Sequence, residues 1–371
     1  MSGEIRAITM PKWGLAMEEG MVAAWHVDEG GAVKNGDEVL DIETSKITNA
    51  YEAAETGVLR RQVVPEGETV PVGALLGVIA DADVADADID AFVAECQAEF
   101  AVAAKESATA APAPESIEAG GRQMAFLKLG DGDATPLVLV HGFGGDMNNW
   151  LFNQPALAED RAVYALDLPG HGISGKDVGA GDLVSLTSAV GGFMDAAGIG
   201  AAHLAGHSLG GAVVAELALT QPERAASLTL VAPAGLGPEI NMDYIDGFIA
   251  AGRRKEMKAV LAMLVADESL VSRDMVNDVL KFKRLDGVDA ALRAIADRVF
   301  ADGRQSTVLA NRLGALATPA QAIWGRQDRI LPPAHADALP ANVPAHLVDA
   351  GHLPHMEAAA EVNRLLADLL G

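Results

Sequence analysis

The sequence predicts a multidomain protein in which an all-β sandwich precedes an α/β domain. Residues 1–80 contain an internal repeat of short apolar stretches and glycines, whereas strand-like and helix-like segments alternate from about residue 121. The intervening residues 81–120 hold 1 Lys against 10 Asp and Glu and are rich in alanine, which is typical of a linker. We therefore expect three segments, 1–80, 81–120 and 121–371.

Composition narrows the classes of function. Half of the 371 residues are apolar, enough to bury a core, and the net charge is −25. A chain this acidic repels nucleic acid and anionic membrane surfaces, so neither is expected as a partner. The single cysteine, Cys96, excludes an internal disulfide and a multi-cysteine site, and no metal is expected. No apolar signal segment is recognisable and no apolar run approaches the ~20 residues that span a bilayer, so we expect a cytoplasmic protein.

The repeat in residues 1–80 has a fixed offset of 37 positions. Its first copy contains Gly20, Val27, Gly30, Val33, Gly36, Val39 and Ile42, and its second contains Gly57, Val64, Gly67, Val70, Gly73, Leu76 and Ile79. Self-similarity at a fixed offset indicates two copies of one structural unit. Glycines mark turns, and alternating apolar residues form inner faces. The pattern predicts two similar β-sheets packed as a small sandwich.

A lysine lies between the two copies, in the stretch "DIETSKITNA" at 41–50. Taken alone, Lys46 is an ordinary solvated lysine of a hairpin. With the repeat around it, residues 1–80 resemble the lipoyl/biotinyl carrier family, including the lead-in D-I-E-T-x-K. The resemblance implies a cofactor in amide linkage to Lys46. Biotin carriers usually flank this lysine with methionine, whereas Ser45 and Ile47 stand here, so lipoate is expected; lipoyl domains more often have Asp at the position of Ser45.

Part of the linker is predicted to be helical. Asp88 and Asp90 suit N-cap positions. The apolar residues Ile89, Phe92, Val93, Cys96 and Phe100 follow at helical spacing. This predicts a helix over about 88–105 with one face resting on another element, and flexible coil over 106–120.

The alternation from residue 121 predicts a mainly parallel sheet with helices on both faces. Strands are expected at 137–140 and within "AVYALDLPGHGIS", "AAHLAGH", "SLTLVAPAG" and "AQAIWGRQD". The motif G-H-S-L-G at 206–210 follows one of these strands and precedes a helix, the context of a nucleophile elbow. A bare match means little in a chain with 39 glycines, but this context makes Ser208 the expected nucleophile. Residues 121–371 resemble the α/β-hydrolase family throughout.

Two further residues complete a set of nucleophile, acid and base in that chain order. Asp328 follows a strand in "WGRQDRILPP", and His352 precedes the last helix in "VDAGHLPHMEA". A serine hydroxyl needs a base within hydrogen-bond reach, and a carboxylate orients that imidazole and stabilises its protonated form. His355 is the competing histidine, and the G-H-x-P setting favours His352. The competing interpretation of Asp328 is a loop residue that caps a helix.

Stabilisation of an oxyanion requires two backbone N–H donors. In this fold one follows the nucleophile, here Leu209, and the other comes from the loop after an early strand. Phe143, in "HGFGG" at 141–145, is the expected second donor. His141 and His171 are expected to be structural.

Residues 236–315 depart from a bare hydrolase core. They are rich in Met, Leu, Ala and paired charges, and they are predicted to form helices of a lid over the site. Met257, Leu261 and Leu264 form an apolar stripe at helical spacing, which is expected to pack on the core rather than contact substrate.

The whole arrangement resembles the dihydrolipoamide acetyltransferase components of acetoin dehydrogenase complexes. An acyl group on a dihydrolipoyl sulfur is a thioester, and a Ser-His-Asp site is suited to acyl transfer. The resemblance implies transfer of an acetyl group from lipoyl-Lys46 through Ser208 to CoA. It also implies a thiamine-diphosphate-dependent dehydrogenase component, a flavin dihydrolipoamide dehydrogenase and a lipoate ligase as partners. Two alternatives remain: an esterase or thioesterase in which water is the acceptor, and a lipoyl carrier or scaffold whose hydrolase domain is idle.

Some expected features of acyltransferases are missing from the sequence. Ordinary dihydrolipoyl acyltransferases end in a trimer-forming domain with an H-x-x-x-D-G motif, whereas "KRLDGVD" at 283–289 has only the Asp-Gly. The small subunit-binding domain and a recognisable CoA motif are also missing. The usual oligomeric core and docking mode are therefore not expected.

Overall fold

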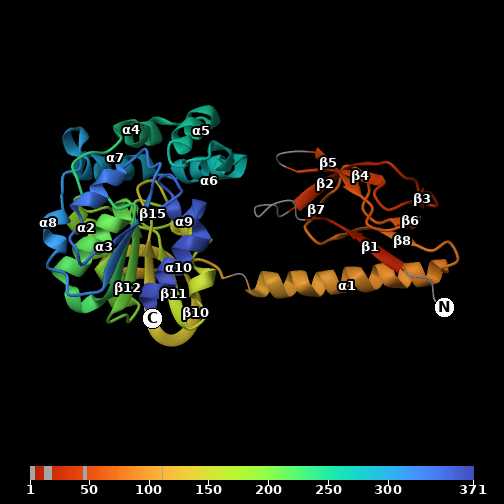
Figure 1. The fold of residues 1–371 in the computed structure, drawn as a ribbon, viewed down its shortest axis with the longest axis horizontal. Coiled ribbons are helices and arrows are strands. Elements are labelled where there is room, and N and C mark those ends of the chain that lie inside the picture. Colours follow the sequence, from red (N-terminus) through yellow and green to blue (C-terminus); the bar gives the residue numbers. More distant parts are fainter. Residues whose placement is uncertain (1–4, 12–18, 45–47, 111) are drawn as a thin grey trace. The chain divides into compact units, whose positions relative to one another are not determined.

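Short strands and a long helix make up the first of two units, Met1–Ala111, and strands alternate with helices in the second, Pro112–Gly371. The computed structural model describes residues 5–11, 19–44, 48–110 and 112–371, so Ser45, Lys46 and Ile47 lie outside the described residues (Figure 1). Among the helices of the described residues, none has the length and apolar character needed to cross a membrane.

In the first unit, the described strands form two antiparallel sheets with the orders β1-β8-β6-β3 and β5-β4-β2-β7. Their bounds are β1 Ile5–Thr9, β2 Glu19–Trp25, β3 Ala32–Val33, β4 Glu38–Glu43, β5 Thr48–Glu52, β6 Gly57–Gln62, β7 Thr69–Pro71 and β8 Leu75–Ala80. The sequence repeat explains this pairing. In the first copy β2 pairs with β4, and 37 positions later β6 pairs with β8.

The repeated positions also have matching backbone and burial. Gly30 and Gly67 both turn at positive φ, +88° and +83°, where a side chain is strained. Val22 and its counterpart Leu59 are both fully buried in the core between the sheets. The predicted sandwich of two similar sheets is therefore confirmed.

Helix α1, Asp86–Ala110, follows β8 and packs on it through the predicted face. Ile89 is fully buried against Leu75 and Val78. Arg60 and Arg61 of β6 hold the start of the helix through ion pairs to Asp86 and Asp90, each 2.8 Å long. The helix is longer at both ends than the predicted 88–105.

The prediction of coil over 106–120 is wrong. Helix α1 continues to Ala110, and β9, Glu115–Ala119, pairs antiparallel with β10, Arg122–Val140. The strand escaped prediction because its residues are mostly exposed and charged, as befits an edge strand, and only Ala119 is buried. The sheet of the second unit therefore begins before residue 121.

In the described part of the second unit the strand order is β11-β10-β12-β13-β14-β15, with all of these pairs parallel and β9 added antiparallel to β10. The bounds are β11 Arg161–Leu166, β12 Ala202–His207, β13 Ala225–Val231, β14 Ala320–Gly325 and β15 Ala345–Val348. Each predicted strand is present. β10 begins well before residue 137, and β15 was not predicted because its short sequence alternates exposed and half-buried residues.

Helices cover both faces of this sheet, as predicted. On one face α2, Leu183–Ala196, and α3, Leu209–Thr220, enter the larger core cluster. On the other, α10, Ala359–Leu370, contributes Val362, Leu365 and Leu366 to a second cluster, and the short α9, Pro354–Glu357, precedes it.

Between β13 and β14 the chain forms a helical insertion. Its helices are α4 Met242–Ala250, α5 Arg254–Ala262, α6 Arg273–Lys283, α7 Val288–Val299 and α8 Ala310–Leu313. Met257, Leu261 and Leu264 are buried in the main core cluster, so the prediction that this stripe packs on the core is confirmed. Lys283 anchors α6 to α4, because its ammonium group donates to the carbonyls of Phe248, Ile249 and Ala251 at 2.6, 2.8 and 2.9 Å.

Candidate active site

Ser208 occupies a strained turn between β12 and α3. Its φ of 51° and ψ of −117° lie in a region that residues with a side chain rarely adopt, and only 8 % of its surface is exposed. The turn is held because the Ser208 N–H donates to Val231 O at 3.0 Å and Ser208 O accepts from Ala212 and Ala234 N–H. This is the geometry of a nucleophile elbow, in which the hydroxyl projects from the end of the sheet.

The two glycines of the motif permit close packing of this turn. A Cβ at Gly206 would overlap the Gly210 carbonyl, and a Cβ at Gly210 would overlap the carbonyls of Val140 and His141. Neither neighbour is a flexible side chain that could move aside. The elbow therefore requires glycine at both positions.

Asp328 and His352 form a buried pair. His352 Nδ1 lies 2.8 Å from Asp328 Oδ2, and the two side chains are 2 % and 0 % exposed. The same carboxylate oxygen accepts from Trp324 Nε1–H at 2.9 Å, while Oδ1 accepts from the backbone N–H groups of Ile330 and Leu331. Asp328 therefore binds the backbone of its own loop and orients the imidazole, but it caps no helix, since the next helical turn begins at Pro333 with Pro332 before it.

Trp324 was missed by the sequence analysis. Its indole ring is fully buried at the end of β14 and supplies one of four donors to the Asp328 carboxylate. The available signal was a tryptophan four residues before the acid in "WGRQD". Four donors around one carboxylate, among the described residues, fix its orientation toward the catalytic histidine.

His207 connects the nucleophile turn to the histidine loop and was also missed. Its Nε2–H donates to His352 O at 2.8 Å, and the two rings lie 4.8 Å apart. Burial keeps His207 neutral by lowering its pKa well below the usual value. The residue next to Ser208 therefore fixes the position of His352, which brings the three predicted residues to one place.

Within the described residues Ser208 Oγ makes no hydrogen bond, so the hydroxyl has no structural role there and is free to react. Contacts between nucleophile and base are often long in ligand-free enzymes and tighten with substrate. The backbone of His352 is also held by the helical insertion, because the backbone N–H of His352 donates to Leu264 O at 2.7 Å.

The two expected oxyanion donors are backbone N–H groups of Phe143 and Leu209. Both residues are buried, and neither N–H finds an acceptor in the part of the chain that the structure describes. Buried N–H groups without a partner are rare in folded proteins. Two of them beside Ser208 are what an oxyanion site requires.

His141 fixes the direction of the Phe143 donor. Leu168 N–H donates to His141 Nε2 at 3.0 Å, so Nδ1 carries the proton and donates to Gly142 O at 2.7 Å. Because the peptide is planar and trans, a fixed Gly142 carbonyl points the Phe143 N–H the opposite way. Burial lowers the pKa of His141 to about 4, which preserves this neutral tautomer. The expectation that His141 is structural is confirmed.

The helical insertion covers the oxyanion loop. Tyr244 of α4 donates its hydroxyl to Phe143 O at 3.0 Å, and the Phe143 ring packs edge-on against Phe248 and Phe300. His171 lies against the same ring and is fully buried, consistent with a structural role. The oxyanion loop is therefore packed beneath the helical insertion.

His355 cannot replace His352 as the base. It is fully buried between Trp150 and His207, with ring centroids 4.6 Å from each, and neither of its ring nitrogens has a partner among the described residues. Burial lowers its pKa to about 3. The geometry therefore favours His352 over its competitor.

Buried neutral histidines make the second unit sensitive to acid. The folded-state pKa is about 4 for His141 and about 3 for His355, against 6.5 for the exposed side chain. Between about pH 6.5 and 4 the unfolded chain binds protons that the folded chain does not. The free energy of unfolding is therefore expected to decrease as the pH is lowered through this window, by about 1.4 kcal/mol per pH unit per histidine. Urea unfolding of wild type and His355→Leu from pH 7.5 to 4.5 checks this. The free energy of unfolding of the variant should depend less steeply on pH, by the contribution of one histidine, and identical slopes for the two proteins would contradict the prediction.

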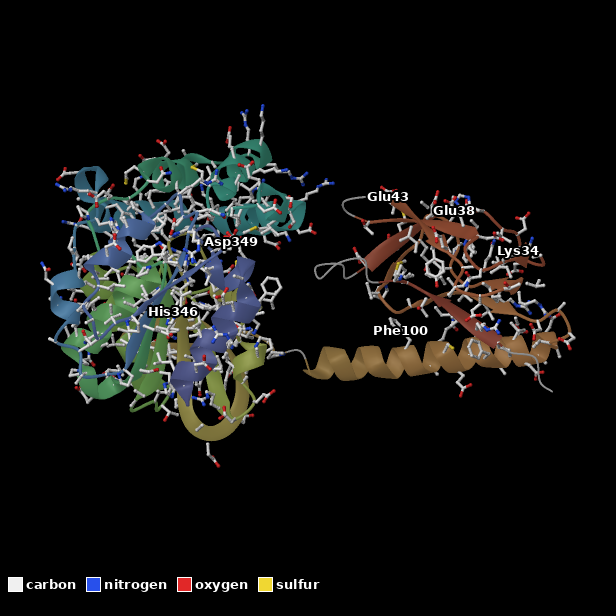
Figure 2. The ribbon with its side chains drawn as sticks, in the orientation of Figure 1. Lys34, Glu38, Glu43, Phe100, His346 and Asp349 are labelled. Atoms are coloured by element: carbon white, nitrogen blue, oxygen red, sulfur yellow. The ribbon has the colours of Figure 1, made fainter. Side chains whose placement is uncertain are left out.

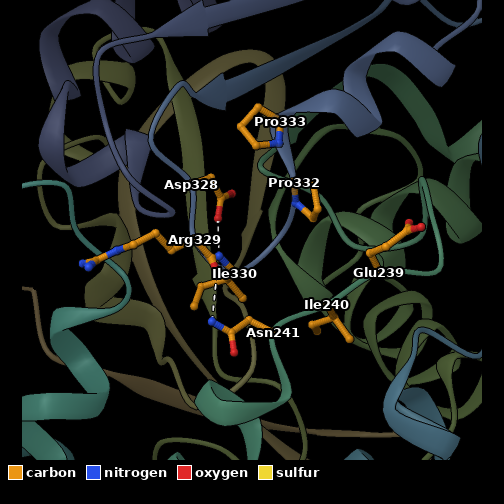
Figure 3. Close-up of a pocket in the computed structure, with 8 residues that line it drawn as sticks. All are labelled: Glu239, Ile240, Asn241, Asp328, Arg329, Ile330, Pro332 and Pro333. Carbon is orange, nitrogen blue, oxygen red and sulfur yellow. Dashed lines mark hydrogen bonds between the residues drawn. The ribbon is translucent and has the colours of Figure 1, made fainter.

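An open pocket of about 350 Å³ lies beside the acid loop (Figure 3). It is lined by Glu239, Ile240, Asn241, Asp328, Arg329, Ile330, Pro332 and Pro333. Asn241 Nδ2–H donates to Arg329 O at 2.9 Å, so the start of the helical insertion is tied to the loop that carries Asp328. Of the predicted site residues only Asp328 borders the pocket, whose walls join the insertion to the acid loop.

Comparisons with known proteins cover both units. Residues 135–359 match the family described as alpha/beta hydrolase fold, and residues 6–79 match the family described as biotin-requiring enzyme. Solved structures agree with the fold of the second unit. A meta-cleavage product hydrolase from Pseudomonas fluorescens superposes with a TM-score of 0.63 at 23% identity, covering 69% of this chain and 96% of its own.

Curated relatives match the entire chain. The dihydrolipoyllysine-residue acetyltransferase component of the acetoin cleaving system of Pseudomonas putida is 49% identical over 367 residues, 99% of each chain. The corresponding component from Cupriavidus necator is 46% identical over 372 residues, covering 100% of this chain and 99% of its own. A 2-hydroxy-6-oxononadienedioate/2-hydroxy-6-oxononatrienedioate hydrolase from Cupriavidus pinatubonensis is 28% identical and covers 68% of this chain. The carrier-type sandwich, the hydrolase fold and the two full-length matches establish that the chain belongs to the family of dihydrolipoyllysine-residue acetyltransferase components of acetoin cleaving systems.

Proposed function

We propose that this chain carries lipoate on Lys46 and moves an acetyl group from it to CoA through Ser208, His352 and Asp328. Residues 1–80 are the lipoyl domain, 81–120 the connection and 121–371 the catalytic domain, with 236–315 as its lid. The catalytic part is supported by one observation above others. A buried Asp328–His352 pair is locked to the residue beside Ser208, whose elbow faces two unpaired N–H groups.

The attachment of lipoate to Lys46 is supported by the strands on either side. β4 ends at Glu43 and β5 begins at Thr48, and these two residues are antiparallel partners, so residues 44–47 connect the two strands of one hairpin. A short connection of this kind suits a side chain that must be offered to other active sites. When bound, the lipoyl group supplies a dithiol that holds the acetyl group as a thioester.

Acylation of Ser208 begins the reaction. His352 Nε2 removes the hydroxyl proton as Oγ attacks the thioester carbonyl, and Asp328 stabilises the imidazolium that forms. The N–H groups of Phe143 and Leu209 bind the oxyanion of the tetrahedral intermediate. Collapse breaks the carbon–sulfur bond, and His352 returns the proton to the departing thiolate.

Deacylation repeats these steps with CoA. His352 takes the proton of the CoA thiol, the sulfur attacks the acetyl-serine carbonyl, and the proton then returns to Ser208 Oγ. The acetyl group is transferred without oxidation or reduction. Water is the competing nucleophile, and the lid that packs on Phe143 through Tyr244 and Phe248 limits its access.

The relatives also support the proposed partners. Their names make them components of acetoin cleaving systems. We place the chain between a thiamine-diphosphate-dependent dehydrogenase component that loads the lipoyl group and a flavin dihydrolipoamide dehydrogenase that reoxidises it, in the cytoplasm. A lipoate ligase would attach the cofactor.

Intact mass spectrometry tests the cofactor. After co-expression with a lipoate ligase, wild type is expected to gain the mass of one lipoyl amide, and Lys46→Ala is expected to gain none. A mass increment that survives in Lys46→Ala would place the modification elsewhere, and no increment in wild type would remove lipoate from the proposal.

The acceptor is tested by product analysis with acetyl-dihydrolipoamide and CoA. Acetyl-CoA is expected to form faster than free acetate. Dominant acetate would favour a thioesterase, a candidate supported by the 28% identity to a hydrolase. The absence of both products would favour a carrier or scaffold with an idle hydrolase domain.

A further inference from the structure

Helix α5 of the lid opens with a concentration of positive charge in a chain whose net charge is −25. Arg253, Arg254, Lys255 and Lys258 are all exposed. The anion among them, Glu256, accepts instead from the two backbone N–H groups that precede the helix. None of the four cations joins an ion pair within the described residues, and we call these four residues the basic turn.

This arrangement is unfavourable for the helix itself. Arg253, Arg254 and Lys255 occupy the N-cap and first two positions, where positive charge opposes the helix dipole. Arg254 and Lys258 are four residues apart, and Lys255 and Lys258 three apart, so like charges lie on one face. An anionic surface docked on these exposed side chains would relieve this repulsion.

The end of α5 lies at the catalytic histidine. The backbone carbonyl of Leu264, in the turn after the helix, accepts from the backbone N–H of His352 at 2.7 Å. Glu357 also connects the insertion to the loop of His352, because its carboxylate accepts from Ala266 N–H at 2.7 Å and from Gly351 N–H at 2.9 Å. At a rise of ~1.5 Å per residue, the basic turn lies about 15 Å along the helix from this contact. A domain docked at the basic turn would therefore be placed for an extended lipoyl-lysine side chain to reach Ser208.

A complementary surface flanks the lysine proposed to carry that arm. On the β4–β5 hairpin, Glu38 lies directly opposite Glu52 in the register, and Glu43 ends β4. All three are exposed, and none forms an ion pair among the described residues. Glu38 and Glu43 project from β4 in Figure 2. Like charges opposite each other destabilise a strand pair. This acidic hairpin therefore has the same unrelieved repulsion as the basic turn, with the opposite sign.

We propose that the basic turn is the docking surface for the acidic hairpin of a lipoyl domain presented by a second copy of the chain. This inference rests on the proposed acetyl transfer and names how the donor is recognised. Complementary charge on two exposed surfaces, one beside Lys46 and one on the helix that ends at His352, carries it. CoA phosphates could also meet the basic turn, but they would leave the acidic hairpin without a role.

The test separates donor and acceptor in two full-length chains. The donor is Ser208→Ala with its reduced lipoyl group acetylated, and the acceptor is Lys46→Ala, which retains Ser208. Acetyl-CoA formation on mixing is expected to fall at least tenfold when the acceptor also carries Arg254→Glu and Lys258→Glu. Adding Glu43→Lys and Glu52→Lys to the donor is expected to recover most of that loss. Arg293→Glu with Arg298→Glu, exposed positions on α7, makes the same change of net charge and is expected to have less than a twofold effect.

Four measurements separate the outcomes. An unchanged rate after reversal of the basic turn, or no recovery with the reversed hairpin, overturns the proposal. A rise in the KM for CoA with an unchanged KM for the protein donor overturns it in favour of CoA binding. Fluorescence anisotropy of the labelled donor chain measures docking without chemistry. If free acetyl-dihydrolipoamide yields no acetyl-CoA with the acceptor that keeps its basic turn, the proposed function fails. Docking is still supported in that case if binding of the donor is lost when the basic turn is reversed and is recovered when the donor hairpin carries the lysine substitutions.

Discussion

Ser208→Ala is expected to lower the rate of acetyl-CoA formation from acetyl-dihydrolipoamide by about four orders of magnitude or more. The substitution removes only Oγ, which makes no structural hydrogen bond within the described residues. The strained turn is held by backbone contacts to Val231, Ala212 and Ala234, and these remain. The loss should therefore appear in kcat, with the fold and the lipoylation of Lys46 intact.

A serine-directed organophosphonate supplies a second readout for Ser208. The reagent is expected to label wild type and not Ser208→Ala. Ser269→Ala, an exposed serine of the helical insertion, is the matched control and should label and turn over as wild type does. Equal labelling of wild type and Ser208→Ala, or acetyl-CoA formation within tenfold of wild type, would exclude the acyl-serine route.

Local patterns in the sequence predicted most of the fold. The 37-residue repeat places Val22 and Leu59, Gly30 and Gly67 at equivalent positions because each copy forms the same strand–turn unit. The elbow at Ser208 was predictable because its constraint lies within five residues. These signals are short-range, so a single sequence contains them.

Contacts between distant segments were not predictable. His207 and His352 are 145 positions apart, and nothing in either neighbourhood encodes the hydrogen bond that joins them. The direction of the Phe143 N–H depends on His141 and on Leu168 from another loop. Such contacts follow from the assembled sheet, which brings the carboxyl ends of its parallel strands to one edge.

Weakly apolar elements were the other omission. β9 and β15 lie toward the edges of the sheet, where exposed residues replace the apolar runs that reveal a central strand. The second half of α1 carries an alanine-rich sequence that continues as helix to Ala110, just before Pro112 and Pro114. Composition separates a linker from a domain, but it does not settle where a helix ends.

Asp328→Asn is expected to lower kcat by about 10⁴-fold. The four groups around the Asp328 carboxylate are all donors: His352 Nδ1, Trp324 Nε1 and the N–H groups of Ile330 and Leu331. An amide keeps one acceptor oxygen and turns its NH₂ toward two donors. If the oxygen stays on the backbone N–H groups, the NH₂ faces His352. The imidazole then presents an unprotonated Nδ1, carries its proton on Nε2, and cannot take a proton from Ser208.

Trp324→Phe separates the charge of Asp328 from its orientation. The phenyl ring keeps the buried apolar volume and removes only the Nε1–H donor, so the carboxylate remains in place and still accepts from His352. We expect a loss of about tenfold in kcat for this variant, far from the loss in Asp328→Asn, with both rates measured by acetyl-CoA formation across pH 5.5 to 9. If Asp328→Asn retained a tenth of wild-type activity, the tautomer of His352 would be set by another group. A loss in Trp324→Phe as large as in Asp328→Asn would instead mean that the indole, and not the carboxylate charge alone, holds His352 in its productive position.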